Sequence, residues 1–167
     1  DGIKAIIHSN VVIIRGYGGT GKSSSVAGLL SCLDEEYSFV QCALSGKASV
    51  NLRDITGKNG STIHTLLGYN PEGGFKHTER DPLMADMIIL DEASMVDIGL
   101  FLSLISAIRT GSKLVMLGDT NQLEAIGVGN VLMDLIDSEL VPVVTFDQIH
   151  RQGAKSGIIP FSIEIAQ

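Results

Sequence analysis

The residues best suited to chemistry form a glycine-rich stretch near the start of the chain, Gly16-Tyr17-Gly18-Gly19-Thr20-Gly21-Lys22-Ser23. It matches the pattern G-x-x-x-x-G-K-[ST] at every fixed position. The β-branched run at residues 11–14 predicts a buried parallel strand before it, and residues 24–33 predict a helix after it. A glycine-rich turn without a ligand is the alternative, but the flanking strand and helix favour a phosphate-binding loop.

Each part of this loop has a distinct chemical role. Glycines let the backbone turn so that its N–H groups face a polyphosphate, and the following helix adds the positive end of its dipole. Lys22 supplies a positive charge for the β- and γ-phosphates, and Ser23 supplies a hydroxyl for Mg²⁺. The residues expected around a bound nucleotide are Gly16, Gly18, Gly19, Thr20, Gly21, Lys22, Ser23 and Ser24.

A second chemical group ends the apolar run Met87-Ile88-Ile89-Leu90-Asp91-Glu92. A strand buried on both faces brings its first polar residues to the carboxyl edge of a parallel sheet, beside the phosphate loop. There Asp91 can bind Mg²⁺ and Glu92 can polarise the water that attacks the γ-phosphate. Apolar strands ending in Asp-Glu also arise by chance, but the upstream loop favours the functional interpretation.

Two later residues are candidates for sensing or stabilising the γ-phosphate. Gln122 follows the predicted strand at residues 113–119, and a glutamine can donate to a phosphate oxygen while accepting from water. Arg151 follows the predicted strand at residues 141–146, where Pro142 indicates an edge strand or a strand start. Arg151 fits charge stabilisation of the γ-phosphate or, equally well, a surface ion pair.

A small polar turn, Ser45-Gly46-Lys47, follows the predicted strand at residues 37–44 and opens another helix through Leu52. Its place at the carboxyl end of a strand puts it on the ligand-binding edge of the sheet. Ser45 and Lys47 could hold a phosphate of a second, extended ligand. A capped helix start with a solvated lysine explains the same residues.

The middle of the chain predicts a short helix and an insertion. Residues 56–60 are a turn cluster, and the helix at residues 61–67 has apolar positions 63, 66 and 67. His64 alone would be a structural or surface histidine. Residues 68–82 combine prolines, glycines and mixed charges, which fits a protruding hairpin or a solvated loop. Residues 93–97 lead into a predicted helix that runs through Ile108, and we expect its apolar residues at 98, 101, 102, 105 and 108 in the core.

Composition limits the class of protein. The 167 residues fit one domain with a small insertion, 44% are hydrophobic, and the net charge of −7 argues against a nucleic-acid-coating protein. Any nucleic-acid contact must therefore be a local patch. No apolar run is long enough to span a membrane, and Cys32 and Cys42 lack metal spacing, so we expect reduced thiols in a cytoplasmic protein. Both ends of the chain read as interrupted helices, which predicts a longer natural protein.

In their order, these motifs resemble those of the RecD-like superfamily 1 DNA helicases, the family of the exodeoxyribonuclease V alpha subunit. The similarity runs along nearly the whole chain and corresponds to the first RecA-like motor domain of that family. The segments that carry it are the glycine-rich loop, Leu44-Ser45-Gly46-Lys47-Ala48, Ser61-Thr62-Ile63-His64-Thr65-Leu66-Leu67, Leu90-Asp91-Glu92-Ala93-Ser94-Met95-Val96-Asp97, Leu117-Gly118-Asp119-Thr120-Asn121-Gln122-Leu123 and His150-Arg151-Gln152.

The resemblance implies ATP and Mg²⁺ as cofactors and 5′-to-3′ movement on single-stranded DNA. It implies catalytic roles for Lys22, Glu92, Gln122 and Arg151, and Mg²⁺ binding by Ser23 and Asp91. Residues 68–82 correspond to a small hairpin that helps to split a duplex. Expected partners are a second RecA-like domain of the same protein and helicase–nuclease subunits. The single-strand path corresponds to Ser45, Gly46, Lys47, Thr62 and His64.

The sequence therefore predicts an α/β P-loop fold of the RecA type, with a mainly parallel sheet, helices on both faces and a small inserted hairpin. Its predicted activity is ATP hydrolysis coupled to movement on DNA. Two rivals remain. A nucleotide kinase needs clustered lid arginines, whereas the five arginines here are scattered along the chain. A non-catalytic nucleotide-binding module needs neither Glu92 nor Gln122 at the sheet edge.

Overall fold

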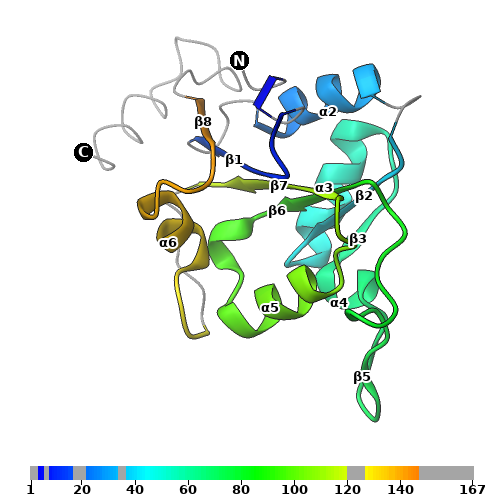
Figure 1. Ribbon diagram of the computed structural model, residues 1–167. Helices are drawn as coiled ribbons and strands as arrows, with labels where there is room; N and C mark the ends of the chain where they lie inside the picture. The colour runs from blue at the N-terminus through cyan, green and yellow to red at the C-terminus, as the bar shows by residue number, and fades with distance from the viewer. Residues whose placement is uncertain (1–3, 6–7, 17–21, 34–36, 120–126, 147–167) are drawn as a thin grey trace.

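A single parallel sheet organises the described part of the chain. The computed structural model describes residues 4–5, 8–16, 22–33, 37–119 and 127–146 (Figure 1). Within them six strands lie in the order β3-β2-β6-β7-β1-β8, and every neighbouring pair is parallel. The strands are β1 (Val11–Gly16), β2 (Phe39–Ala43), β3 (Gly60–Thr62), β6 (Met87–Asp91), β7 (Lys113–Gly118) and β8 (Val143–Phe146).

Helices cover both faces of this sheet, as predicted. The chain moves from β1 to β2 and β3 in one direction across the sheet and then returns through β6 and β7 to β8. Because parallel crossovers are right-handed, this reversal changes the face on which the helices lie. Figure 1 shows the first pair on one side and the others opposite. The first pair is α2 (Lys22–Leu33) and α3 (Gly46–Thr56), and the others are α4 (Ile63–Leu66), η1 (Ala93–Met95), α5 (Ile98–Ser106) and α6 (Val131–Asp137).

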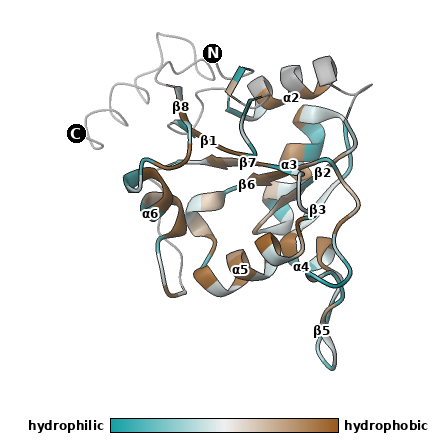
Figure 2. Cartoon of the chain, viewed as in Figure 1, coloured by the Kyte–Doolittle hydropathy of each residue, from teal (hydrophilic) through white to brown (hydrophobic). Residues whose placement is uncertain are grey.

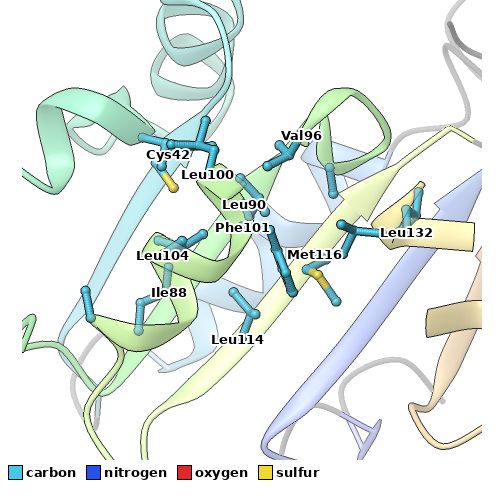
Figure 3. Close-up of a cluster of buried hydrophobic side chains, with 14 of the residues drawn as sticks. Cys42, Ile88, Leu90, Val96, Leu100, Phe101, Leu104, Leu114, Met116 and Leu132 are labelled. Carbon is cyan, nitrogen blue, oxygen red and sulfur yellow. The ribbon is translucent and has the colours of Figure 1, made fainter. Parts of the chain in front are cut away.

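The central strands are apolar on both faces because both faces are buried. In β6, Ile88 and Leu90 join one core cluster while Met87 and Ile89 join the other. The hydrophobic colouring of these strands in Figure 2 follows from this double burial. In Figure 3, side chains of α5 and the strands meet in the first cluster, among them Leu90, Leu100, Phe101, Leu104 and Met116.

The core face of α5 differs from the prediction. Ile98, Leu102 and Ile105 were expected in the core, but their exposed fractions are 50%, 58% and 39%. The buried positions are instead Leu100, Phe101 and Leu104. Six of the nine residues of α5 are Leu, Ile or Phe, so helical spacing fits more than one face, and within α5 Phe101 alone was assigned correctly. Ile108, beyond the end of α5, is partly buried against the same cluster.

Other element boundaries differ by a few residues. The helix predicted to run through Leu52 continues to Thr56, and the expected turn cluster at residues 56–60 ends in the edge strand β3. β8 is the opposite edge strand and begins directly after Pro142, as the proline indicated.

The insertion at residues 68–82 contains a hairpin. β4 (Tyr69–Asn70) and β5 (Gly74–Phe75) pair antiparallel and extend away from the main sheet in Figure 1. This confirms the inserted hairpin of the predicted fold. No helix among the described residues is long and apolar enough to cross a membrane.

Candidate functional site

The carboxyl ends of the strands bring the predicted site residues to one edge of the sheet. All six strands are parallel, so the segments that leave β1, β2, β6 and β7 emerge at the same edge. The register fixes their spacing: Ala43 of β2 is the partner of Asp91 of β6, and Arg15 of β1 is the partner of Gly118 of β7. The phosphate loop therefore follows β1 and the Asp91-Glu92 pair lies at the end of β6, both at the same edge of the sheet.

The phosphate loop is described at its two ends. Gly16 closes β1, and Lys22 and Ser23 open α2. The Lys22 ammonium donates a hydrogen bond to the Gly16 carbonyl, so the lysine side chain reaches back across the base of the loop. Gly18, Gly19, Thr20 and Gly21 lie outside the described residues, and for Ser24 only the backbone, in α2, is described. The order strand, loop and helix is the one that phosphate binding requires.

Asp91 and Glu92 occupy the end of β6 and a sharp turn. Asp91 is the last residue of β6, and its Oδ1 accepts a hydrogen bond of 2.8 Å from the Glu92 backbone N–H. Glu92 has a φ of 55°, in the left-handed region that a non-glycine residue seldom adopts. Backbone strain of this kind concentrates at functional sites. The strand therefore ends at Asp91, and the backbone turns at Glu92.

The environment of Glu92 raises the pKa of its carboxyl. Burial raises the pKa of Glu92 above its ordinary value, hydrogen bonding from the Ser45 side chain and backbone lowers it, and the neighbouring Asp91 charge raises it again. The net direction of the pKa shift is upward. A carboxylate with a raised pKa is a better general base for water than an ordinary glutamate.

Ser45 joins this carboxylate to the start of α3. Its Oγ accepts the Ala48 backbone N–H at 3.1 Å, which makes Ser45 the N-cap of α3. The same hydroxyl donates to Glu92 Oε2 at 3.2 Å. Gly46 and Lys47 follow in the exposed first turn. The sequence predicted the capped helix start and its place at the ligand edge, but not the contact with Glu92, which depends on the pairing of β2 with β6.

Thr62 and His64 lie together at the edge strand β3 and the helix α4. Thr62 ends β3 and caps α4, and its Oγ1 accepts the Thr65 backbone N–H at 3.2 Å. His64 is exposed and packs against the hairpin, with ring centroids 5.5 Å from Tyr69 and 5.8 Å from Phe75. Sequence spacing gave no signal for this aromatic cluster. The cluster connects the predicted single-strand path with the inserted hairpin.

The remaining predicted site residues, Gln122 and Arg151, lie outside the described part of the chain. Sequence reasoning gave no separate role to Asp119, which follows β7 at the same edge and is 6% exposed. The polar end of an apolar strand was the available signal. Buried carboxylates at the ligand edge of a parallel sheet are candidates for binding or positioning groups.

The donor set fits Mg²⁺ better than a transition metal. Among the residues that the structure describes, no three His, Cys, Asp or Glu side chains gather into a metal cluster. Mg²⁺ needs no such cluster, because it keeps several waters and takes one or two protein oxygens beside substrate phosphates. The Ser23 hydroxyl and the Asp91 carboxylate are hard oxygen donors at the edge of the sheet, so they fit this ion.

Comparison with known proteins agrees with this geometry. The family model described as the AAA domain matches residues 1–167. The chain belongs to the AAA domain family. As an AAA domain with a parallel sheet and a strand–loop–helix phosphate site, it has the P-loop fold that the sequence predicted.

Among curated proteins, this AAA domain is similar to the ATP-dependent RecD2 DNA helicase of Deinococcus radiodurans, with 40% identity over 152 residues. It is also similar to the RecBCD enzyme subunit RecD of Mycolicibacterium smegmatis, with 31% identity over 187 residues. The matches cover 89% and 96% of this chain but only 21% and 34% of those relatives. These similarities confirm the resemblance to RecD-like helicases.

A solved structure supports the fold. Bacteroides Pif1 bound to single-stranded DNA superposes with a TM-score of 0.63 at 22% identity. The match covers 95% of this AAA domain and 42% of the Pif1 chain. At this identity the similarity bears on the fold alone.

Proposed function

We propose that this AAA domain is the ATP-hydrolysing motor domain of a DNA helicase that moves along single-stranded DNA. One observation carries the proposal: the Ser45–Glu92 hydrogen bond of 3.2 Å joins the predicted water-activating carboxylate to the start of the predicted DNA-binding helix. In a motor, ATP hydrolysis must be coupled to DNA binding. Here the segment that carries Glu92 contacts the segment that begins at Ser45. The names of the similar RecD2 and RecD proteins support the same reading.

In this proposal each residue at the sheet edge has a separate role in ATP hydrolysis. Lys22 binds the β- and γ-phosphates, and Glu92 orients the attacking water and accepts its proton. Gln122 and Arg151 contact the γ-phosphate from segments outside the described residues. Ser23 and Asp91 would hold Mg²⁺, which when bound neutralises phosphate charge. The raised pKa of Glu92 suits its role as a general base.

The DNA path runs along the adjacent helix starts and the hairpin. The exposed Gly46 and Lys47 present backbone N–H groups and a positive charge, which suits a backbone phosphate. Thr62 adds a hydroxyl and His64 an exposed ring. Tyr69, 51% exposed on the hairpin, offers a face on which a base can stack. We assign the hairpin to strand separation at the junction with duplex DNA.

This chain spans only a small part of the length of its relatives, and the proposed partners are inferred from the rest of that length. A second RecA-like domain would close on the nucleotide and supply the other wall of the site, and helicase–nuclease subunits would join through the remainder of such a protein. The buried free thiol of Cys42 fits a reducing compartment, and we place the protein in the cytoplasm.

ATP hydrolysis by the natural full-length protein, with and without single-stranded DNA, tests the proposal. We expect DNA to stimulate turnover, and Glu92→Gln to lower turnover by at least about 10²-fold, in line with loss of a general base. Nucleotide binding, measured with a fluorescent ATP analogue, should survive in Glu92→Gln. Glu139→Gln, at an exposed carboxylate after α6, is the matched control and should hydrolyse ATP like the wild type.

The same assay separates the rival functions. Transfer of the γ-phosphate to a nucleotide acceptor in place of water would establish a kinase. Tight nucleotide binding without turnover in the full-length protein would establish a binding module. Turnover that is indifferent to DNA would remove the helicase assignment.

A further inference from the structure

The turn between α3 and β3 contains the pair Asn59-Gly60, to which neither ATP hydrolysis nor DNA binding gives a role. Asn59 is exposed and lies in irregular backbone, after Gly57 has ended α3 and before Gly60 opens β3. Its side-chain amide makes no hydrogen bond to any residue that the structure describes. Asn59 is therefore a solvated amide directly before a glycine.

An asparagine before a glycine can react with its own main chain. The backbone nitrogen of Gly60 attacks Asn59 Cγ, the C–N bond of the side-chain amide breaks, and ammonia leaves with the proton of the Gly60 N–H. The product is a succinimide ring. Water then opens the ring at either carbonyl and gives aspartate or isoaspartate, whose main chain runs through the former side chain. Glycine favours the attack because it has no Cβ to obstruct it and adopts unusual backbone angles readily.

The packing of β3 against α3 favours glycine at this position. A Cβ on Gly60 would lie 3.2 Å from the Ser49 carbonyl oxygen and 3.4 Å from Gln41 Cγ. Any other residue would press against these atoms, although it would also slow the attack on Asn59. The reactive pair is thus part of how the edge strand fits the sheet.

Anchors on both sides of Asn59 make the fold sensitive to a change in main-chain length. Gln41 Nε2 donates to the Lys58 carbonyl at 2.6 Å and to Thr56 Oγ1 at 2.8 Å. Gly60 is the register partner of Gln41 in the pairing of β2 with β3. Isoaspartate would insert a further main-chain carbon between Lys58 and Gly60, so both could not keep these partners. Gln41 is 1% exposed, and an unsatisfied buried amide is costly.

We propose that Asn59 deamidates spontaneously in the native protein and that its isoaspartate product displaces β3 from β2. Water is the only co-reactant, so no enzyme, metal or oxidant takes part. β3 is the element that gives way, because it is a three-residue edge strand that pairs, among the described strands, with β2 alone. Nothing in this chemistry depends on the proposed function.

Two other exposed asparagines serve as internal references. Asn51 lies in α3 before Leu52, and the helical hydrogen-bond pattern ties the Leu52 N–H to the preceding turn and away from the Asn51 side chain. Asn70 precedes Pro71, whose nitrogen has no hydrogen to lose. Both should keep their amides while Asn59 converts.

Incubation of the natural full-length protein in mildly alkaline buffer, with and without urea, tests the reaction when each asparagine is followed by mass spectrometry. Cleavage after arginine gives one peptide, residues 54–80, with Asn59 and Asn70, and another, residues 16–53, with Asn51. Without urea we expect the mass gain of an amide-to-acid conversion at Asn59 alone. An isoaspartyl methyltransferase should methylate the peptide 54–80, which identifies isoaspartate. Asn59→Gln should show neither change, because its longer side chain would have to close a larger ring.

Hydrogen exchange at residues 60–62 tests the structural consequence. Aged wild type should exchange these amides faster than fresh wild type. Fresh Asn59→Asp has the charge of the product but a normal main chain, and it should exchange like fresh wild type. Aged Asn59→Gln should do the same.

Each part of the proposal has a result that overturns it. Native conversion of Asn59 that is no faster than that of Asn51 would overturn the assignment of the site. Conversion only in urea would overturn it as well, since the fold would then protect Asn59. If Asn59 converts but exchange at residues 60–62 is unchanged, the displacement of β3 is wrong. Equally fast exchange in fresh Asn59→Asp would assign the effect to charge and contradict the role of the inserted carbon.

Discussion

Ala43 of β2 and Asp91 of β6 are partners in the parallel register of the central sheet. The chain leaves each strand just beyond this pair, and Ser45 and Glu92 meet there at 3.2 Å. Two segments that are far apart in sequence, each with its own expected ligand, are therefore adjacent because of strand order. In the proposed motor, the residues assigned to ATP hydrolysis and those assigned to DNA binding therefore meet at Ser45 and Glu92.

The hairpin aromatic cluster gives a prediction for unwinding. Tyr69 packs 5.2 Å from Phe75 and 5.5 Å from His64, measured between ring centroids, and remains 51% exposed. We expect Tyr69→Ala to slow unwinding of a partial duplex about tenfold, because a stacked base loses its platform. ATP hydrolysis stimulated by single-stranded DNA should stay near the wild-type rate.

Tyr69→Phe is the control for that experiment, since it keeps the ring and removes only the hydroxyl. It should unwind like the wild type. Equal unwinding by Tyr69→Ala and the wild type would show that this ring takes no part in strand separation.

The amino-terminal edge of the sheet gives a prediction for pH dependence. The Asp86 carboxylate accepts from Ser38 Oγ at 2.6 Å, from Ser38 N–H at 2.9 Å and from Arg109 at 2.9 Å. Hydrogen bonds from Ser38, followed by the Arg109 charge, lower the pKa of Asp86 below its ordinary value of 3.8. A lowered native pKa stabilises the fold above the unfolded-state pKa, and this stabilisation is lost as pH falls through the native value.

Asp86→Asn should therefore be less stable than the wild type at about pH 7, and the difference should narrow at about pH 3. Urea midpoints at the two pH values measure it. Asp137→Asn, at an exposed carboxylate that ends α6, should shift the midpoint little at neutral pH. A difference between Asp86→Asn and wild type that is the same at both pH values would contradict this account.

Replacement by alanine should have opposite effects on the stability of the fold at Gly118 and at Gly28. A Cβ on Gly118 at the end of β7 would lie 2.3 Å from Leu132 Cδ2, in a core where Leu132 is 1% exposed, whereas a Cβ on Gly28 of α2 would meet no atom within 4 Å. We expect Gly118→Ala to destabilise the fold by about 1–3 kcal/mol through overpacking. Gly28→Ala should stabilise it by about 0.5–1 kcal/mol through helix propensity. Chemical denaturation measures both, and equal effects would be contrary to the packing described.

Burial should make the Cys42 thiol inert in the native protein. Cys42 is 0% exposed, and burial, assisted by the Asp91 charge, raises the pKa of the thiol to about 12. In a Cys32→Ser background we expect labelling of Cys42 by iodoacetamide only through unfolding, since the thiolate is the reactive form. Labelling should accelerate sharply across the urea transition. Fast labelling without denaturant would show that β2 opens locally.

The sequence was most informative where apolar strands end in polar residues. The runs before Gly16, Ser45, Asp91 and Asp119 identified the central strands and the edge at which their ends meet. β3 escaped prediction because Gly-Ser-Thr has no apolar pattern and is held by pairing with β2. The face of α5 was misassigned because its six Leu, Ile and Phe residues occupy more than one face of the helix.

Contacts between segments distant in sequence were beyond prediction. Ser45 was expected near a ligand, but its bond to Glu92 exists only because β2 and β6 are neighbours. The edge-on contact of His64 with Tyr69 and its tilted contact with Phe75 likewise depend on where the hairpin lies relative to α4. Such contacts cannot be predicted from the local sequence unless the strand order is known.

Displacement of streptavidin from biotinylated single-stranded DNA by the full-length protein tests the central claim, that ATP hydrolysis at this sheet edge drives movement along DNA. The account predicts ATP-dependent release of streptavidin from the 3′ end, as expected for 5′-to-3′ movement, and no release by Glu92→Gln. ATP hydrolysis that DNA stimulates without release at either end would contradict it.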